Sequence, residues 1–215
     1  MTSFLRPLAY RHRWIYDSVT AVSSLSVGGV GRLRGLGLDA LSHRLEPNAE
    51  ILDLCCGSGE AAAPWISAGY AVTGLDVSPR ALDLAAERHP LMQRVEGLAE
   101  APPLKDQSFN AIQLSVALHE FPRAERELVL TSALRLLKPG GWLVLVDLHP
   151  ADPLMRLPQQ VFCALCLKPR PPPPCWRTTY RRNFRLSASS MWSKSCWQVG
   201  LCNGSLPNAH DQQRS

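Results

Sequence analysis

Residues 50–59 read Glu-Ile-Leu-Asp-Leu-Cys-Cys-Gly-Ser-Gly, and this stretch decides the fold. An apolar run ends in an aspartate, two glycines follow with one residue between them, and residues 60–63 suit a helix. The pattern predicts a buried strand that enters a helix through a tight turn. Glycines leave the backbone of such a turn without side chains, so a ligand can approach it closely.

A second strand is predicted at residues 71–76, and it ends in Asp76, seventeen residues after Gly59. A glycine turn beside an acid at the end of the neighbouring strand is typical of a nucleoside site, in which the carboxylate accepts the ribose hydroxyls. One candidate ligand is a nicotinamide dinucleotide, whose glycine fingerprint tolerates the alanine at position 62.

Asp53, four residues before Gly57, separates the candidate ligands. A carboxylate at this position would repel a pyrophosphate but would attract the ammonium group of an amino acid. The residues therefore favour S-adenosylmethionine, a nucleoside that carries an amino acid, over a dinucleotide. The third possibility is a strand–helix turn that binds no ligand.

Three further segments follow residues 51–60 (ILDLCCGSGE) in order: GLDVSPRALDLA at 74–85, EGLAEAPPLKDQSFNAIQLSVALHEF at 96–121 and LRLLKPGGWLVLVDL at 134–148. Together they resemble the class I S-adenosylmethionine-dependent methyltransferases. Within that class they resemble the small-molecule branch of the ubiquinone and menaquinone biosynthesis enzymes (methyltransferase type 11 domain). The resemblance runs from about Tyr16 to about Pro150. It implies S-adenosyl-L-methionine as the cofactor.

The resemblance also implies a cofactor site at the carboxyl ends of the strands, formed by Asp53, Gly57, Gly59, Asp76, Val77, Ala99, Ser115 and Tyr16. Asp53 would face the ammonium group, the glycines would allow close approach, and Asp76 would hold the ribose. Val77 and the backbone of Ala99 would contact adenine, while Ser115 and Tyr16 would line the methionine end. Three of these residues could have structural roles instead. Asp53 could cap the following turn, Ser115 could simply end a strand, and Tyr16 could pack on a surface helix.

Two positions depart from the family pattern. Cys55 stands where the first motif has glycine, and Leu98 stands where the loop beside adenine has an aspartate or asparagine. Leu98 offers no polar atom to the adenine amino group, so we expect only backbone contacts there.

His119 follows the fourth predicted strand, on the side where the resemblance places the methyl acceptor. A histidine there could accept the proton of a phenol or enol during methylation, or it could be only a polar loop residue. We take it as the candidate catalytic residue. The expected acceptor is a small, lipophilic or aromatic molecule.

Strands alternate with helices along the central part of the chain. Strands are predicted at 50–54, 71–76, around Val95, at 109–115 and at 142–147, with helices at 59–68, 78–89 and 124–137. This order predicts an α/β fold with a doubly wound, mainly parallel sheet. We expect an N-terminal helical segment at 1–47, the S-adenosylmethionine-binding core at 48–155 and an irregular, basic, proline-rich tail at 156–215.

The tail differs from the rest of the chain. Residues 167–215 hold eight of the 23 Lys and Arg residues and one of the 18 acids, and a run of prolines occupies 171–174. We expect the tail to lack regular structure and the sheet to lack its last two strands, which would leave the fifth strand exposed and the protein prone to aggregate.

We explain the tail by a frameshift, either biological or arising in sequencing. Codons read two nucleotides later can spell Phe-Glu-Thr-Glu-Thr-Ala over residues 167–172 and Ala-Gly-Gly-Ser-Leu-Gln-Arg-Ile-Thr-Ala over 197–207. Both peptides resemble C-terminal segments of the family.

Two alternative functions remain. One is an inactive or cofactor-binding-only product. The other is a nucleic-acid methyltransferase recruited by the basic tail, which we rank last because residues 1–166 carry more acids than bases.

Localisation and metal content complete the expectations. Arginines occupy the positions where a secretion signal needs an apolar region, and no apolar run reaches the ~20 residues of a membrane span. These features predict a cytoplasmic protein. Cys163 and Cys166 have the spacing of zinc ligands, but no second pair with similar spacing follows, so we expect no metal site.

Overall fold

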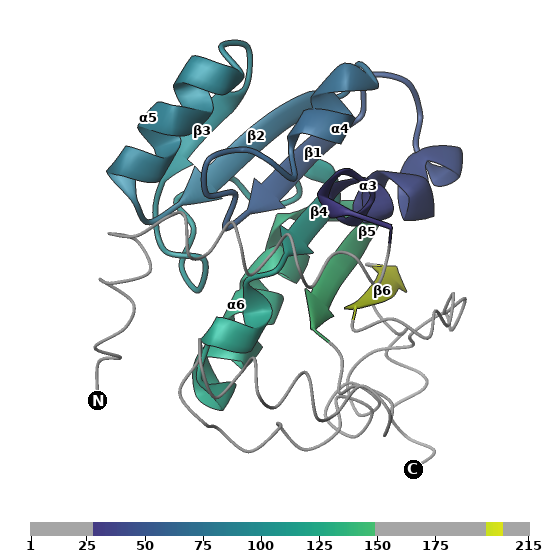
Figure 1. The fold of residues 1–215 in the computed structure, drawn as a ribbon. Coiled ribbons are helices and arrows are strands. Elements are labelled where there is room, and N and C mark those ends of the chain that lie inside the picture. Colours follow the sequence, from purple (N-terminus) through teal and green to yellow (C-terminus); the bar gives the residue numbers. More distant parts are fainter. Residues whose placement is uncertain (1–27, 149–196, 204–215) are drawn as a thin grey trace, which may run out of the picture.

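A mainly parallel sheet forms the centre of the molecule (Figure 1). The computed structural model describes residues 28–148 and 197–203. In chain order the strands are β1 Glu50–Leu54, β2 Ala71–Asp76, β3 Gln93–Glu96, β4 Phe109–Ser115, β5 Leu137–Leu148 and β6 Trp197–Asn203. Their order in space is β3-β2-β1-β4-β5-β6, and only β6 runs antiparallel to its neighbour. The predicted doubly wound, mainly parallel fold is confirmed.

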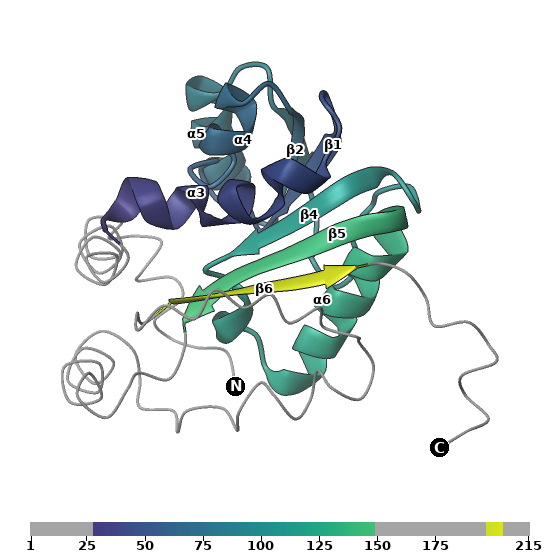
Figure 2. The same cartoon turned by 90° about the vertical axis from the view of Figure 1, so that its right-hand side faces the viewer.

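Helices cover both faces of the sheet (Figure 2). They are α3 Val30–Leu41, α4 Ala63–Ser67, α5 Pro79–Arg88 and α6 Arg123–Leu136, with 3-10 turns η2 Ser42–Arg44 and η3 Leu118–Glu120. Side chains alternate along each strand, so Ile51 of β1 packs with α3, α4 and α5, whereas Leu52 packs with α6 and η3. Two apolar cores result, one on each face.

The turn after β1 shortens the following helix. A helix is predicted from residue 59, but α4 begins at Ala63 because Gly57 and Gly59 adopt positive φ angles of 52° and 77°. The helix predicted from Ser78 agrees with α5. The Ser78 side chain accepts a hydrogen bond from the backbone N–H of Ala81 and so caps that helix.

The lysine–proline–glycine–glycine segment at 138–141 is part of β5 instead of a separate turn before it. Gly140 has a φ of 77°, and the register between β4 and β5 shifts between Phe109 and Ala111. An irregularity of this kind adds residues to one strand without ending the pairing. The strand therefore begins directly after α6.

The tail supplies β6, which corrects two expectations. Residues 197–203 pair with 142–148 of β5, although we expected no regular structure beyond residue 167 and an unpaired fifth strand. The physical reason is that strand pairing uses backbone N–H and C=O groups, so a segment poor in aliphatic residues can still complete an open edge. Leu143 of β5 is buried. The domain boundaries and the frameshift stay predictions.

Several expectations fall outside the described residues, including the role of Tyr16 and the zinc-like spacing of Cys163 and Cys166. Within residues 28–148 and 197–203 no helix is both long enough and apolar enough to cross a bilayer.

Candidate cofactor and acceptor site

Asp53 is a buried carboxylate, and one of its two oxygens accepts no hydrogen bond from the described residues. It lies near the end of β1 and is 1% exposed. Its Oδ1 accepts a hydrogen bond from the Gln113 side chain at 3.3 Å, while Oδ2 has no partner among the described residues. Burial raises the pKa of Asp53 to about 7, the Gln113 bond opposes this rise, and the charge of Asp76 adds to it. An orphaned buried carboxylate oxygen is costly unless a ligand satisfies it.

Asp76 connects the turns that follow β1 and β2. Its Oδ2 accepts from the backbone N–H of Gly57 at 2.8 Å, and its Oδ1 accepts from the N–H of Ser78 at 2.9 Å. Each carboxylate oxygen has two lone pairs, so both can still accept a hydroxyl from a ligand. The predicted neighbours Gly57 and Asp76 are therefore in direct contact.

The two glycines of the turn have different surroundings. No described residue lies within 4 Å of the point where a Gly57 side chain would begin, so a ligand could approach the backbone there. At Gly59 the same point lies 2.9 Å from His89 and 3.4 Å from Ala85, so this glycine packs closely against α5 and its end. Close approach of a ligand is thus compatible with Gly57, whereas Gly59 has a packing role.

Cys55 has a φ of 63°, a conformation that is costly for any residue with a side chain. Glycine adopts this conformation without that cost, which fits the glycine that the resemblance implies at this position. Burial, with the nearby carboxylates of Asp76 and Asp53, raises the pKa of the Cys55 thiol. The thiol therefore stays protonated and is a poor nucleophile.

The segment expected to face adenine is held by α6. Val77 and Leu98 are about half exposed, whereas Ala99 is buried and belongs to the core on the α6 face of the sheet. Ser132 donates to the backbone oxygen of Glu100, and Arg135 donates to the backbone oxygens of residues 102 and 104. Leu98 thus projects from a loop that α6 anchors, and Val77, directly after β2, is a second exposed apolar side chain.

The opposite part of the site follows β4. Ser115, half-buried, ends that strand, and Val116 adopts a φ of 56°, which is strained for a β-branched residue. Beyond it, Asp147 of β5 accepts from the backbone N–H of His119 at 2.9 Å and lies 2.7 Å from its Nδ1. Arg126 of α6 donates to the backbone oxygens of His119 and Phe121, which fixes the same short segment.

The charge state of His119 depends on Asp147. Burial lowers the pKa of the imidazole, but the hydrogen bond and negative charge of Asp147 outweigh burial, and the net pKa lies above its usual value. Because Nδ1 faces a carboxylate, the neutral ring carries its proton on Nδ1 and its lone pair on Nε2. This is the tautomer that a general base requires.

Sequence reasoning missed three residues that support the site. Asp147 was predicted to lie at a strand end but was given no role, and Gln113 and Trp65 were not considered. A polar residue inside an apolar strand, as at Gln113, is the signal that could have revealed one of them. No motif marks Trp65.

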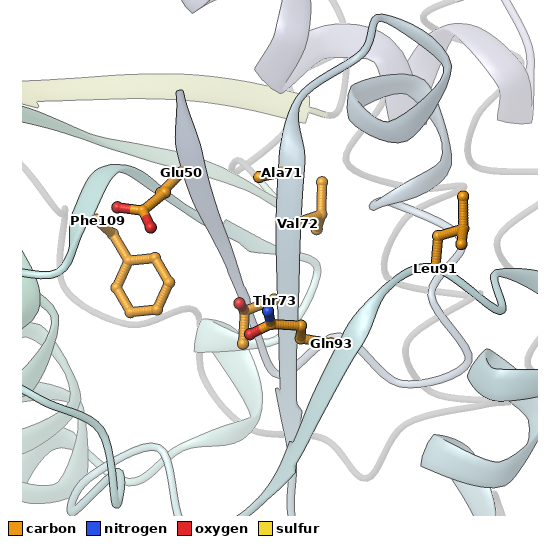
Figure 3. Close-up of a pocket in the computed structure, with 7 residues that line it drawn as sticks. All are labelled: Glu50, Ala71, Val72, Thr73, Leu91, Gln93 and Phe109. Carbon is orange, nitrogen blue, oxygen red and sulfur yellow. The ribbon is translucent and has the colours of Figure 1, made fainter. Parts of the chain in front are cut away.

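A small pocket lies at the amino ends of the parallel strands (Figure 3). It has a volume of about 110 Å³ and is lined at the beginnings of the strands by residues such as Glu50, Ala71 and Gln93. Asp53, Asp76 and Ser115 lie near the carboxyl ends of their strands instead, where open parallel sheets bind ligands. The pocket is therefore separate from the candidate site.

Comparison with known proteins gives a consistent result. A family model described as a methyltransferase domain matches residues 51–141. An uncharacterized methyltransferase of Synechocystis sp. is 39% identical over 166 residues, which are 77% of this chain and 77% of that protein. A demethylmenaquinone methyltransferase of Paenarthrobacter aurescens is 34% identical over 142 residues, 66% of this chain. The chain spans 54% of the length of this second relative.

Solved structures agree on the fold. The PH0226 protein of Pyrococcus horikoshii superimposes with a TM-score of 0.61, at 18% identity, over 80% of this chain and 90% of that one. A TehB-like SAM-dependent methyltransferase of Corynebacterium glutamicum gives a TM-score of 0.60, at 18% identity, over 92% and 96%. At this identity the likeness concerns the fold alone.

Proposed function

Because the chain belongs to the S-adenosylmethionine-dependent methyltransferases, we propose that it methylates a small lipophilic or aromatic acceptor with His119 as the base. The relatives named for demethylmenaquinone support a lipophilic, ring-containing acceptor. The observation that carries the proposal is the unpartnered Oδ2 of buried Asp53, close to the Gly57–Asp76 contact.

The residues present fit the cofactor. An ammonium group is the partner that a buried carboxylate lacks, and Asp76 keeps lone pairs for the ribose hydroxyls. Val77 and Leu98 offer apolar surface to adenine, with Ala99 contributing backbone. Ser115 and, beyond the described residues, Tyr16 are proposed for the methionine end.

When bound, S-adenosylmethionine supplies a methyl group attached to a positively charged sulfur. The chain's part is to position the acceptor and to remove its proton. His119 Nδ1–H donates to Asp147, so Nε2 is the atom that can take the proton from an acceptor hydroxyl. The acceptor would lose its hydroxyl proton to Nε2 and bond to the methyl carbon as the carbon–sulfur bond breaks, so its charge would be unchanged and S-adenosylhomocysteine would be left.

Calorimetry with S-adenosylhomocysteine, the demethylated product, tests the cofactor site. We expect binding to the wild-type protein, and we expect Asp76→Ala to weaken it by about 1.5–3 kcal/mol, the scale of hydrogen bonds to a charged group. Binding of NADH without any response to S-adenosylhomocysteine would contradict the proposal.

Turnover tests the acceptor separately. Transfer of a radiolabelled methyl group to a substituted naphthohydroquinone supports the catalytic part. Cofactor binding without transfer to any ring-containing acceptor would identify a binding-only protein. Transfer to RNA or DNA, with an affinity that falls steeply with salt, would replace the small acceptor with a nucleic acid.

A further inference from the structure

We propose that Gln113 is a positioning residue that holds Asp53 so that one carboxylate oxygen remains for the ammonium group of the cofactor, with Trp65 fixing the orientation of the Gln113 amide. This inference rests on the cofactor site proposed above. It assigns a role to two residues that are not among the predicted cofactor-binding residues.

The three groups form a continuous chain of hydrogen bonds. The Trp65 indole N–H of α4 donates to Gln113 Oε1 at 2.8 Å. Gln113 Nε2 donates to the Ala61 backbone oxygen at 3.1 Å and to Asp53 Oδ1 at 3.3 Å. An indole nitrogen can only donate, so it sets which end of the amide faces Asp53. The NH2 group must then face the carboxylate.

The sheet itself places these groups together. Asp53 and Gln113 are register partners on adjacent parallel strands and lie on the same face, both 1% exposed. On that face α3 crosses closely, because a side chain at Gly37 would begin only 2.1 Å from Gln113 Oε1. The amide is thus enclosed between strand and helix and has little freedom to turn.

A neutral amide suits this role better than a cation. Within the described ranges no Lys or Arg forms an ion pair with Asp53, so its negative charge is not cancelled. Lysine or arginine would stabilise the carboxylate but would compete with the ligand's ammonium group. Gln113 supports the ionised form through one hydrogen bond and leaves the charge available.

The experiment compares two nucleosides that differ in the amino acid. S-adenosylhomocysteine carries the ammonium group, and 5′-methylthioadenosine lacks the whole amino acid. We expect Gln113→Leu to weaken the first by about 10- to 100-fold at pH 7, as loss of a hydrogen bond to a charged group does. Binding of 5′-methylthioadenosine should change less than twofold.

A pH series separates positioning from general damage. Losing the Gln113 bond raises the pKa of Asp53 further, so the deficit of Gln113→Leu should shrink as pH rises from 6 to 9. Ionisation of the ligand's own amine cancels in the ratio of variant to wild type. A merely structural defect would leave that ratio constant across the pH series.

Two further variants decide the outcome. Val144→Ala alters a buried apolar register neighbour of Gln113 and should weaken both nucleosides equally or neither. If Gln113→Leu fails to fold, Trp65→Phe removes only the indole N–H and should show the same ligand-selective loss on a smaller scale. Equal, pH-independent losses for both nucleosides would overturn the inference. Failure of the wild type to bind either one would overturn the proposed function itself.

Discussion

Asp147 holds His119 twice, with Oδ2 on its backbone N–H at 2.9 Å and Oδ1 on its ring Nδ1 at 2.7 Å. The first bond fixes the main chain of the segment after β4, and the second fixes the tautomer of the ring. One carboxylate at the end of β5 therefore sets both the position and the basicity of the candidate base.

If His119 is the base, His119→Ala should lower kcat/KM by about 10²–10⁴-fold, the usual contribution of general acid–base catalysis. In the wild type, kcat/KM should fall as pH drops through the raised pKa of His119, since only the neutral ring accepts a proton. Asp147→Asn removes the charge that raises this pKa, so the acidic limb should move to lower pH while the plateau falls. A pH–rate profile checks both, and an unmoved limb would assign Asp147 a structural role only.

Asp53 should make the ligand-free protein less stable as pH rises. Its folded-state pKa of about 7 lies above the ordinary value of 3.8, so the folded protein binds the extra proton. The contribution to stability is fully present below about pH 4 and is lost as pH rises through about 7. Asp53→Asn cannot ionise, so its free energy of unfolding should exceed that of the wild type at pH 8, by as much as about 4 kcal/mol.

Urea unfolding at pH 4 and pH 8 measures this difference. The same variant should lose affinity for S-adenosylhomocysteine, because the amide no longer attracts an ammonium group. Greater stability together with weaker binding is typical of a residue kept for function. A wild-type stability that does not fall between these pH values, relative to Asp53→Asn, would contradict the prediction.

A substitution at Leu98 is expected to tighten cofactor binding. Half of this side chain is exposed, on a loop that α6 holds through Ser132 and Arg135. An acidic side chain there could accept a hydrogen bond from the adenine amino group. Leu98→Asp should therefore tighten cofactor binding by up to about 1–2 kcal/mol, measured by calorimetry. Leu98→Ala serves as the control, since it removes apolar surface without adding an acceptor.

The pairing of β6 with β5 predicts a role for the end of the chain. A chain that stops at residue 196 leaves the outer backbone groups of β5 unpaired. We expect it to aggregate at lower concentration and to unfold at lower temperature than the full chain. Restoring the alternative reading frame should give a more stable and more soluble protein than this chain. Light scattering and thermal unfolding of the three proteins check this, and a frame-restored protein no better than the present one would remove the frameshift explanation.

Local patterns predicted the parts of the fold that depend on local physics. Apolar runs between turn signals placed β1, β2 and β4 at their observed bounds, because buried parallel strands need apolar side chains on both faces. Ser78 followed by proline placed the start of α5. The closeness of Gly57 and Asp76 also followed, since Gly57 lies in the turn after β1 and Asp76 ends the neighbouring parallel strand β2.

Long-range relationships were not predictable in this way. The Trp65–Gln113–Asp53 chain joins residues up to 60 positions apart, and only the register of β1 with β4 brings them together. The pairing of β6 depends on backbone groups that every sequence possesses, so composition argued wrongly against it. The positive φ of Cys55 shows that the departure from the family pattern has a conformational cost, which the sequence alone did not reveal.

The close packing at Gly37 limits which substitutions positions 37 and 113 can accept during evolution. Helix α3 supplies none of the candidate site residues, yet a single methyl group at position 37 would overlap the amide oxygen of Gln113. Such a change would force either the helix off the sheet or the amide away from Trp65. Positions 37 and 113 are therefore free to vary only together, with a shorter side chain on the strand accompanying any larger one on the helix. In an alignment of close relatives this would be visible as covariation between an N-terminal helix and the fourth strand.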